Sequence, residues 1–519
     1  MAIPGTPESQ AALQLAWRYL HDAALFEAHL PQRTHRDVLV ARLQPHHAQQ
    51  LLDAGIVELT SSDEARGCVL VFAVAEFVKR RLRAIQNTVD ANNALPPAPT
   101  VAFRSIAARC ELVHAGSAAA QVDFMAYYTQ FPLAAAVRKY FCYRLLFPDG
   151  STKLVQQCVG LTGMSHMVYT AVSATRHLLA FQQRSRASDD HIDNVLFVGD
   201  PDAVASDLAT LRDRCRVAGV TINEDVTQPE LLVATALDWC GLHLDFTAKT
   251  VALTTKVTAK IALSWSLRAG WTWRGFAAHI GLMWYTMQVI SIPVAQFFNL
   301  LRFVSEISRR MQQLDDKNWD DTAEIWPCVW PDLEAWTALA LTNAPRPVPH
   351  NRRPDVLVLV DSSAYGYGYI AVDTITGHLY QHGAPWPAAF ATHHGDEKLR
   401  RSAFTEPWGI LFTKRHLTPQ LDSDRFFRFG TDSQTAAAVH RKGYSARSYD
   451  LNNVAFLDRH EFPNMRSEFV HVPGVQNIFA DALSRGKTIA DVETKGLSMQ
   501  ASLRRLLGDN PAELITGGG

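Results

Sequence analysis

The sequence predicts a multidomain protein of α+β and α/β class, and three observations lead to this class. The chain has 519 residues, which is too long for a single hydrophobic core. Stretches with the apolar spacing of helices and short apolar runs typical of strands both occur along its length. Residues 342–355 contain four prolines and no apolar periodicity, which is typical of a linker. A new domain is therefore expected to begin just after this segment.

The composition is that of a folded protein with nearly balanced charge. Hydrophobic residues make up 47% of the chain and charged residues 19%, and no charge block marks a long disordered arm. With a formal net charge of −1, the whole-molecule field gives no reason to expect a polyanionic partner, so any nucleic-acid surface must be local. One candidate is the segment 77–83, which contains Lys79, Arg80, Arg81 and Arg83. The alternative for this segment is a solvated hairpin edge.

Cysteine use and the apolar stretches predict an intracellular protein, cytoplasmic or nuclear, that does not span a membrane. Seven cysteines without a CxxC pair give neither a disulfide framework nor a zinc-ligand pattern, which favours a reducing compartment. The N-terminal sequence MAIPGTPESQ lacks the organisation of a secretory signal. The most apolar stretch, 275–304, is long enough to span a bilayer, but His279, Gln288, Pro293 and Gln296 interrupt it. A buried helix pair is the favoured interpretation.

The first part of the chain is predicted to begin with helices and then to turn to strands. Residues 12–60 look helical, with one helix ending near Gly55. CVLVFAV and LRAIQNTV are then predicted to be two strands of a β-hairpin joined by the basic turn. The stretch 117–133 runs into a strand that carries Asp123, and a helical stretch is expected after it. Residues 158–181 place a glycine-containing loop before a long apolar helix.

The stretch HIDNVLFVGD, residues 191–200, predicts a tight turn followed by a short buried strand. An apolar run begins at Val195, directly after Asp193 and Asn194, and Asp-Asn is ordinary turn chemistry. These residues alone leave open whether Asp193 is a metal ligand or only forms the turn.

A helix, further strands and a helical segment are expected next. Pro201 begins a helix in which apolar residues recur at helical spacing from Val204 to Cys215. Residues 237–253 alternate as strands do, and residues 256–315 are mostly helical in pattern.

Four carboxylates fall at element boundaries after the linker. They are Asp361 at the end of an apolar strand, Glu406 at a helix start with Pro407 behind it, Asp432 where a strand enters a helix, and Asp481 in a helical turn. Like charges in a shared pocket raise one another's pKa values, so they are tolerable together mainly when a divalent cation neutralises them. Acidic residues at strand ends are common, so the prediction of a shared metal site depends on the order of the four carboxylates and on the motifs around them.

This order, with TDS at the strand-to-helix turn and HVPGVQNIFADALSR around the last aspartate, resembles the ribonuclease H domains of retroelement polyproteins across residues 355–486. The resemblance implies that the four carboxylates hold two Mg²⁺ ions, for which Mn²⁺ can substitute, and that the domain hydrolyses a phosphodiester. His471 lies near the matching catalytic loop; the alternative is a structural histidine.

The first 340 residues resemble the reverse transcriptase that usually precedes such a domain. LLDAGIVEL looks like the entry to the fingers, and the basic hairpin resembles the one that grips the phosphates of the incoming nucleotide, with Arg83 in the matching position. VDFMAYYTQFPL is similar to the palm strand whose aspartate, here Asp123, holds both metals. QCVGLTGMSHMVYTAV resembles the template-contacting loop, which includes Gly160, and LDWCGLHL resembles the primer grip, which includes Trp239 and Gly241.

By the same resemblance, HIDN occupies the place of a palm hairpin that commonly reads aromatic-x-Asp-Asp. Asp193 becomes the second metal ligand beside Asp123, because two carboxylates flank a metal pair that clamps the primer 3′ oxygen and the triphosphate. Asn194 replaces the second aspartate and can orient a water or a ligand with less negative charge. Tyr128 matches the bulky residue beneath the sugar of the incoming nucleotide, where its ring favours deoxynucleotides; the alternative is a core tyrosine.

Three departures from the family pattern count against an active polymerase. His191 stands where an aromatic residue is common, RASDDH makes the incoming strand unusually polar, and Met164-Ser165 replaces an Ala-Pro pair. Each fits either a divergent active enzyme or a decayed one. Asp189 and Asp190 offer a competing register for the metal ligand, but no apolar strand follows them directly.

Together these motifs resemble a retrotransposon reverse transcriptase with ribonuclease H, closest to the VIPER and DIRS groups of tyrosine-recombinase retroelements and similar also to other LTR retroelement polymerases. The resemblance implies a right-hand polymerase followed by a ribonuclease H-like domain. Fingers and palm are expected in 1–250, a helical thumb and connection in 251–345, the ribonuclease H domain in 346–488 and a C-terminal tail in 489–519.

The implied partners are an RNA template, a DNA primer, the RNA/DNA hybrid and deoxynucleoside triphosphates, with the nucleic acids held mainly through backbone and shape. The sequence leaves two alternatives open. One is a hybrid-binding or scaffold protein whose polymerase hand is catalytically dead and which retains only the nuclease. The other is a nuclease whose hand only positions the hybrid.

Overall fold

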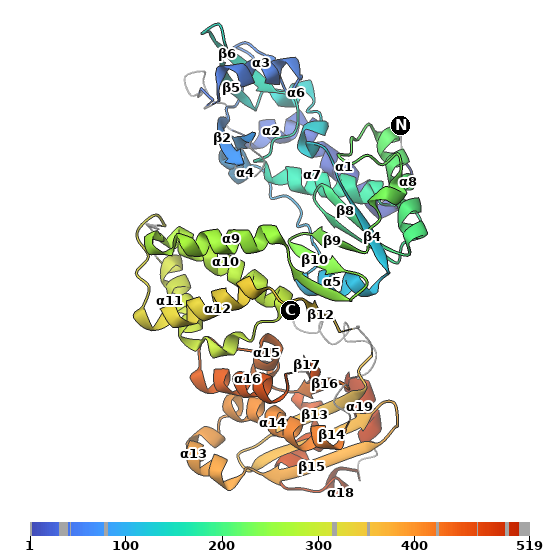
Figure 1. The fold of residues 1–519 in the computed structure, drawn as a ribbon, viewed down its shortest axis with the longest axis vertical. Coiled ribbons are helices and arrows are strands. Elements are labelled where there is room, and N and C mark those ends of the chain that lie inside the picture. Colours follow the sequence, from blue (N-terminus) through green and yellow to red (C-terminus); the bar gives the residue numbers. More distant parts are fainter. Residues whose placement is uncertain are drawn as a thin grey trace. The chain divides into compact units, whose positions relative to one another are not determined.

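The structure is a computed structural model that describes residues 3–30, 40–41, 43–76, 81–313, 319–349, 353–421, 425–463, 465–493 and 498–507. The chain divides into two compact units, Met1–Val251 and Ala252–Gly519. Both contain helices and sheets, as the ribbon in Figure 1 shows, so the prediction of a mixed multidomain fold is confirmed.

The first unit alternates short strands with helices. Its elements are α1 (Pro7–His21), α2 (Ala23–His29), α3 (Pro45–Asp53), β1 (Val57–Leu59), β2 (Leu70–Glu76), β3 (Arg81–Asn87), α4 (Val89–Ala94), α5 (Ile106–Cys110), β4 (Ala118–Asp123), α6 (Ala135–Arg138), β5 (Cys142–Leu146), β6 (Thr152–Gln157), α7 (Ser165–Leu178), β7 (Ala187–His191), β8 (Asn194–Gly199), α8 (Pro201–Ala218), β9 (Ala236–Trp239) and β10 (Leu242–Asp245); β11 (Thr250–Leu253) spans the boundary between the units.

The second unit begins with helices and continues into a larger sheet. Its elements are α9 (Thr255–Ser266), α10 (Trp273–Ile290), α11 (Phe298–Gln313), α12 (Trp330–Thr342), β12 (Arg346–Pro347), β13 (Val356–Ser362), β14 (Gly366–Asp373), β15 (Leu379–Pro385), α13 (Ala388–Leu399), α14 (Ser402–Leu417), β16 (Phe426–Thr431), α15 (Gln434–Lys442), α16 (Tyr449–Glu461), β17 (Arg466–His471), α17 (Ile478–Ser484), α18 (Ala490–Glu493) and α19 (Met499–Leu507).

A three-stranded antiparallel sheet, in the order β4-β8-β7, organises the first unit. The apolar run Val195–Val198 of β8 is completely buried in its middle, because both faces of this strand are covered. The register pairs Asp123 at the end of β4 with Asn194 at the start of β8. The predicted tight turn is confirmed: β7 and β8 are joined through Ile192 and Asp193, with Ile192 in the left-handed region at φ 60°.

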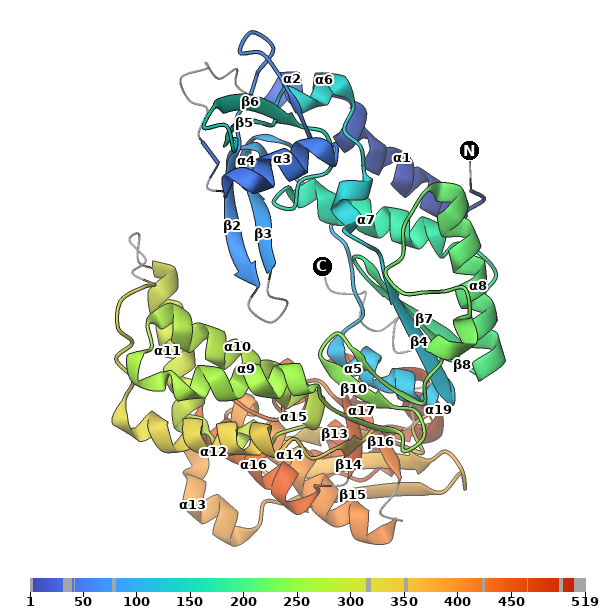
Figure 2. The ribbon, with the colours of Figure 1, turned by 45° about the horizontal axis from the view of Figure 1, so that its top comes forward.

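The β2–β3 hairpin of the first unit is also confirmed, and Figure 2 shows its two strands side by side. The helical stretch expected after residue 133 is wrong. Only the four residues of α6 are helical there, and the chain then forms the antiparallel strands β5 and β6. The turn between them contains Pro148-Asp149-Gly150, a turn signal that marks a hairpin rather than a continuing helix.

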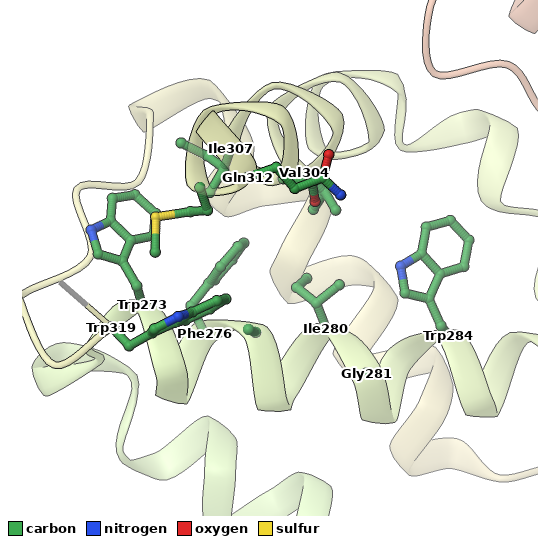
Figure 3. Close-up of a pocket in the computed structure, with 12 residues that line it drawn as sticks. Trp273, Phe276, Ile280, Gly281, Trp284, Val304, Ile307, Gln312 and Trp319 are labelled. Atoms are coloured by element: carbon green, nitrogen blue, oxygen red, sulfur yellow. The ribbon is translucent and has the colours of Figure 1, made fainter. Parts of the chain in front are cut away.

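The helices α10 and α11 of the second unit confirm the helix pair expected in the apolar stretch, although each helix buries only one side and exposes the other. His279, which interrupts that stretch, is buried and hydrogen-bonds the hydroxyls of Ser264 and Thr337. No helix in the described ranges combines the length and apolarity needed to cross a membrane. Between α10 and α11 lies an apolar groove of about 440 Å³, and Figure 3 shows Ile280 and Trp284 among the side chains that line it.

A five-stranded mixed sheet, in the order β15-β14-β13-β16-β17, forms the rest of the second unit. β13 pairs with β14 antiparallel and with β16 parallel. Alternate residues of β13 face opposite sides, as the pleat requires. Val358 packs with α14 and α15 on one face, whereas Leu359 packs with α17 and α19 on the other. Because both faces are covered, all seven residues of β13 are buried, which explains its continuous apolar run.

Candidate active site

Three of the four predicted carboxylates of the second unit come together. Asp361, Glu406 and Asp432 each offer a carboxylate oxygen, and these oxygens lie within 4.8 Å of one another. Asp361 lies near the end of β13, and Asp432 directly follows β16. Because β13 and β16 are parallel neighbours, their carboxyl ends meet at the same edge of the sheet. α14 brings Glu406 to this edge.

Close packing of α14 against β13 places Glu406. Gly409, three residues after Glu406, leaves no room for a side chain, because a Cβ there would lie 1.9 Å from the Ser362 hydroxyl oxygen. Glu406 is 3% exposed. The Ser362 backbone N–H donates to its Oε1 at 3.2 Å, and the Thr431 hydroxyl lies 3.4 Å from its Oε2. The glutamate is therefore fixed from both strands.

The buried carboxylates destabilise one another's charged forms. Burial, followed by the charges of Asp361 and Asp432, raises the pKa of Glu406 to about 9. Burial also raises the pKa of Asp361 to about 7; a hydrogen bond from Ser484 opposes this rise, and the charges of Asp432 and Asp481 add to it. A divalent cation relieves this repulsion, and an all-carboxylate donor set is the kind that Mg²⁺ and Mn²⁺ prefer. The residues present therefore fit a hard divalent cation.

Asp481 lies near this cluster but outside its 4.8 Å group. Its charge raises the pKa values of Asp361 and Asp432. However, its carboxylate is 43% exposed and forms an ion pair with Arg485 at 2.7 Å. A role for Asp481 as a ligand would require exchange of this exposed pair, which is weakly held.

Ser484 is a residue of this site that the sequence motifs did not single out. Its hydroxyl donates to Asp361 Oδ2 at 2.7 Å and lies 2.9 Å from the Asp481 carbonyl oxygen. The hydrogen bond favours the charged carboxylate of Asp361. Its three-residue spacing from Asp481 within ADALSR puts both on one face of α17, which was a usable signal.

His471 is exposed at the end of β17, close to Asp432. Its Nε2 lies 3.0 Å from the Asp432 carbonyl oxygen. The pKa of Asp432 is raised chiefly by burial, and the charge of His471 lowers it. A histidine in this place can hold the Asp432 backbone and can also reach toward solvent.

The second group of predicted residues lines one pocket of about 700 Å³ in the first unit. Asp123, Tyr128, Gly160 and Asp193 all border it. The pairing of β4 with β8 brings the two aspartates together, and the Phe124 N–H donates to the Asp193 carbonyl oxygen at 2.9 Å. Tyr128 is half-buried at the pocket wall.

Amide side chains contact both aspartates of the pocket. Asn223 Nδ2 donates to Asp123 Oδ2 at 2.8 Å, and Asn194 Nδ2 donates to Asp193 Oδ1 at 2.9 Å. Glu224 accepts the Asp123 backbone N–H at 2.8 Å. Sequence patterns did not single out Asn223 and Glu224, which lie 100 residues beyond the strand they contact. Within the described part of the chain, the only acidic group of three or more with converging ligand atoms is the one in the second unit.

The competing aspartates have other partners. Asp189 is 5% exposed and accepts hydrogen bonds from Arg109 Nε at 2.8 Å and from the Trp239 indole N–H at 2.7 Å. Asp190 pairs with Arg176 at 3.1 Å. Asp189 therefore belongs to a buried ion pair, which favours Asp193 as the aspartate available to the pocket.

Several predicted nucleic-acid contacts stay predictions. Trp239 is 1% exposed and packs inside the first unit, where its indole N–H donates a hydrogen bond to Asp189. Gly241, at φ 89°, forms the turn between β9 and β10. Gly160 borders the pocket, where a Cβ would lie 2.7 Å from the Tyr128 carbonyl oxygen. The side chain of Arg83 lies outside the described residues, although its backbone belongs to β3.

Comparisons with known proteins give a distant structural likeness. No known family profile and no curated protein sequence matches the chain. A solved structure of the foamy viral protease-reverse transcriptase dRH in complex with double-stranded DNA is similar with a TM-score of 0.45 and 11% identity, covering 86% of this chain and 72% of that chain. The foamy viral protease-reverse transcriptase with double-stranded DNA gives a TM-score of 0.43 and 11% identity, over 91% and 99% of the two chains. The same viral protein with an RNA/DNA hybrid gives 0.44 and 10%, over 91% and 64%. At TM-scores below 0.5 the likeness carries no argument, so the acidic residues themselves must support any function.

Proposed function

We propose that the chain is a reverse transcriptase with ribonuclease H activity, which copies RNA or DNA templates into DNA and cleaves RNA in RNA/DNA hybrids. The convergence of Asp361, Glu406 and Asp432 carries the nuclease part of the proposal, together with the motif order in which they occur. Two buried carboxylates and a half-buried one, all with raised pKa values, are a costly arrangement that is typical of a functional site.

The nuclease residues have separate tasks. Asp361, Glu406 and Asp432, with Asp481 beside them, would hold two divalent cations, Mg²⁺ or Mn²⁺. Such cations supply an activated water and stabilise the leaving oxygen in phosphodiester hydrolysis. Glu406 would have to give up the proton that its raised pKa retains at neutral pH, because its carboxylate must be charged to act as a ligand. Ser484 orients the carboxylate of Asp361.

The polymerase part of the proposal assigns Asp123 and Asp193 as metal ligands in the pocket of the first unit. Asn194 would orient a ligand beside them, and Tyr128 would lie beneath the sugar of the incoming deoxynucleotide. Arg83 would bind its triphosphate. RNA template, DNA primer and hybrid would contact the loop around Gly160 and the turn that contains Gly241.

The proposed origin is a retrotransposon of the VIPER or DIRS group. In this proposal 1–250 form fingers and palm, 251–345 the thumb and connection, and 346–488 the ribonuclease H domain. His471 would contribute to hydrolysis from the rim of the nuclease site.

A second candidate is a nuclease whose polymerase hand does not catalyse. The amide contacts favour it, since both pocket aspartates accept a hydrogen bond from an asparagine and Asn194 takes the place of a further acid. This candidate predicts RNA cleavage without nucleotide incorporation.

One assay separates the candidates. The chain is incubated with Mg²⁺, deoxynucleotides and a DNA primer annealed to end-labelled RNA, and both primer extension and RNA cleavage are followed. Full activity gives both products; the nuclease candidate gives only RNA fragments. If neither product forms with the unmodified chain, or if cleavage persists in Asp361→Asn and Asp432→Asn variants, the proposed function is wrong.

A further inference from the structure

A buried cluster of charged side chains lies in the second unit near Asp361, Glu406 and Asp432, which together are called the acidic site below. Lys414 on α14 contacts Asp458 Oδ1 on α16 at 2.7 Å, and His440 Nδ1 on α15 lies 2.8 Å from Asp458 Oδ2. The three side chains are at most 8% exposed. Burial raises the pKa of Asp458, but the charges of Lys414 and His440 outweigh it and hold this pKa below its usual range.

The second ring nitrogen of His440 contacts the helix that carries Glu406. Its Nε2 lies 2.9 Å from the Pro407 carbonyl oxygen. The Asp458 carboxylate and the Pro407 carbonyl oxygen are both acceptors, so each ring nitrogen of His440 faces an acceptor. Lys414 already supplies a cation to Asp458. The distinct contact of His440 is therefore the one with Pro407.

Pro407 follows Glu406 directly and lies inside α14. A proline within a helix has no N–H to donate to the preceding turn, so the turn that carries Glu406 lacks one backbone hydrogen bond. His440 adds a hydrogen bond to the carbonyl group of this same residue. α15 begins two residues after Asp432, so His440 joins the helix that follows Asp432 to the helix that carries Glu406.

We propose that His440 is a positioning residue for the acidic site: it fixes the proline turn of α14 and thereby holds Glu406 at the distance from Asp361 and Asp432 that a divalent cation requires. The inference rests on the proposed metal-dependent nuclease. A positioning role and a purely structural role of His440 make different predictions. Only the positioning role predicts that cation affinity depends on the contact with Pro407.

Two amide substitutions separate the two hydrogen bonds of His440. His440→Gln places an amide N–H where Nε2 was, so it keeps the donor to Pro407. His440→Asn places its amide near the former Nδ1, so it keeps the donor to Asp458 and loses the donor to Pro407. Both variants remove the same ring, and both leave Lys414 paired with Asp458.

The measurements are Mn²⁺ affinity by titration calorimetry, the Mg²⁺ concentration that gives half-maximal RNA cleavage, the KM for hybrid, and thermal stability. His440→Asn should weaken Mn²⁺ binding and raise the Mg²⁺ requirement by about 10-fold or more, as loss of a residue that orients a metal ligand does. His440→Gln should stay within about threefold of the unmodified chain in both quantities. The KM for hybrid should be the same in all three proteins.

Equal losses of cation affinity in the two variants, or no loss in His440→Asn, would overturn the positioning role. If His440→Asn does not fold, His440→Phe replaces it, since phenylalanine fills the volume of the ring and lacks both donors. If the unmodified chain binds Mn²⁺ but cleaves no hybrid, the proposed function fails, and the Mn²⁺ affinities still decide the role of His440.

Discussion

Replacing Glu406 with glutamine should stabilise the metal-free chain, and by an amount that depends on pH. An unfolded glutamate has a pKa near 4.5, whereas the folded carboxyl group has a pKa of about 9. The folded state therefore binds a proton that the unfolded state has lost between these values, so stability falls as pH rises from 4.5 to 9. Each pH unit in this window costs about 1.4 kcal/mol. The cost is then under about 1 kcal/mol at pH 5, about 3 kcal/mol at pH 7 and about 6 kcal/mol at pH 9.

Glutamine resembles the neutral glutamate in shape and takes up no proton, so Glu406→Gln should gain roughly these amounts. Its amide oxygen can still accept the Ser362 N–H. The assay is hydrogen exchange of the backbone amides of β13 and β16 in metal-free protein at pH 5, 7 and 9, corrected for intrinsic exchange rates. These amides report on the stability of the two strands whose ends carry Asp361 and Asp432. A stability difference that does not grow with pH, or a variant less stable than its parent at pH 7, would refute the reasoning.

Four further outcomes are expected. Asp432→Asn should abolish RNA cleavage in the hybrid and leave primer extension within about twofold, and gel assays of the two products would expose any shared loss. Asp123→Asn should do the reverse; loss of cleavage as well would mean that the substitution unfolds more than the pocket. Ser484→Ala removes the hydrogen bond that favours charged Asp361, so the acid limb of the cleavage pH profile should move up by about one pH unit, and an unmoved limb contradicts this. Arg109→Met leaves the buried carboxylate of Asp189 without its closest cation, and should lower the free energy of unfolding of the first unit in urea by about 3 kcal/mol or more. A loss under about 1 kcal/mol would mean that the pair is not buried in solution.

Local patterns in the sequence predicted many elements of the fold. The apolar runs of β8 and β13 follow from short-range physics, because a strand buried on both faces needs several apolar residues in succession. The turn at Asp193 and the helix after Pro201 follow from residues that prefer those positions. The strands β5 and β6 were missed because the alanine-rich segment before them resembles a helix, whereas they are held by pairing with one another and by the pairing of β6 with β1.

The partners of the site residues could not be predicted in the same way. The sequence already ranked Asp189 below Asp193, because no apolar strand follows Asp189 directly, but it could not show that Asp189 is paired with Arg109, which lies 80 residues away. Ser484 contacts Asp361 across 123 residues. Such contacts depend on how elements pack, and no periodicity of a single element encodes them. The motif around Asp481 placed its helix correctly, but the ion pair with Arg485 emerged only from the folded geometry.

The most direct test of the central claim is calorimetric titration of the chain with Mn²⁺ at pH 7 in buffers of different ionisation enthalpy. Because Glu406 has a pKa of about 9 and Asp361 of about 7, cation binding at the acidic site must displace their protons, and about one proton or more should be released per site. The release should disappear, and binding weaken strongly, when both residues are replaced by their amides. Binding that releases no protons, or that survives the double replacement, would contradict the account.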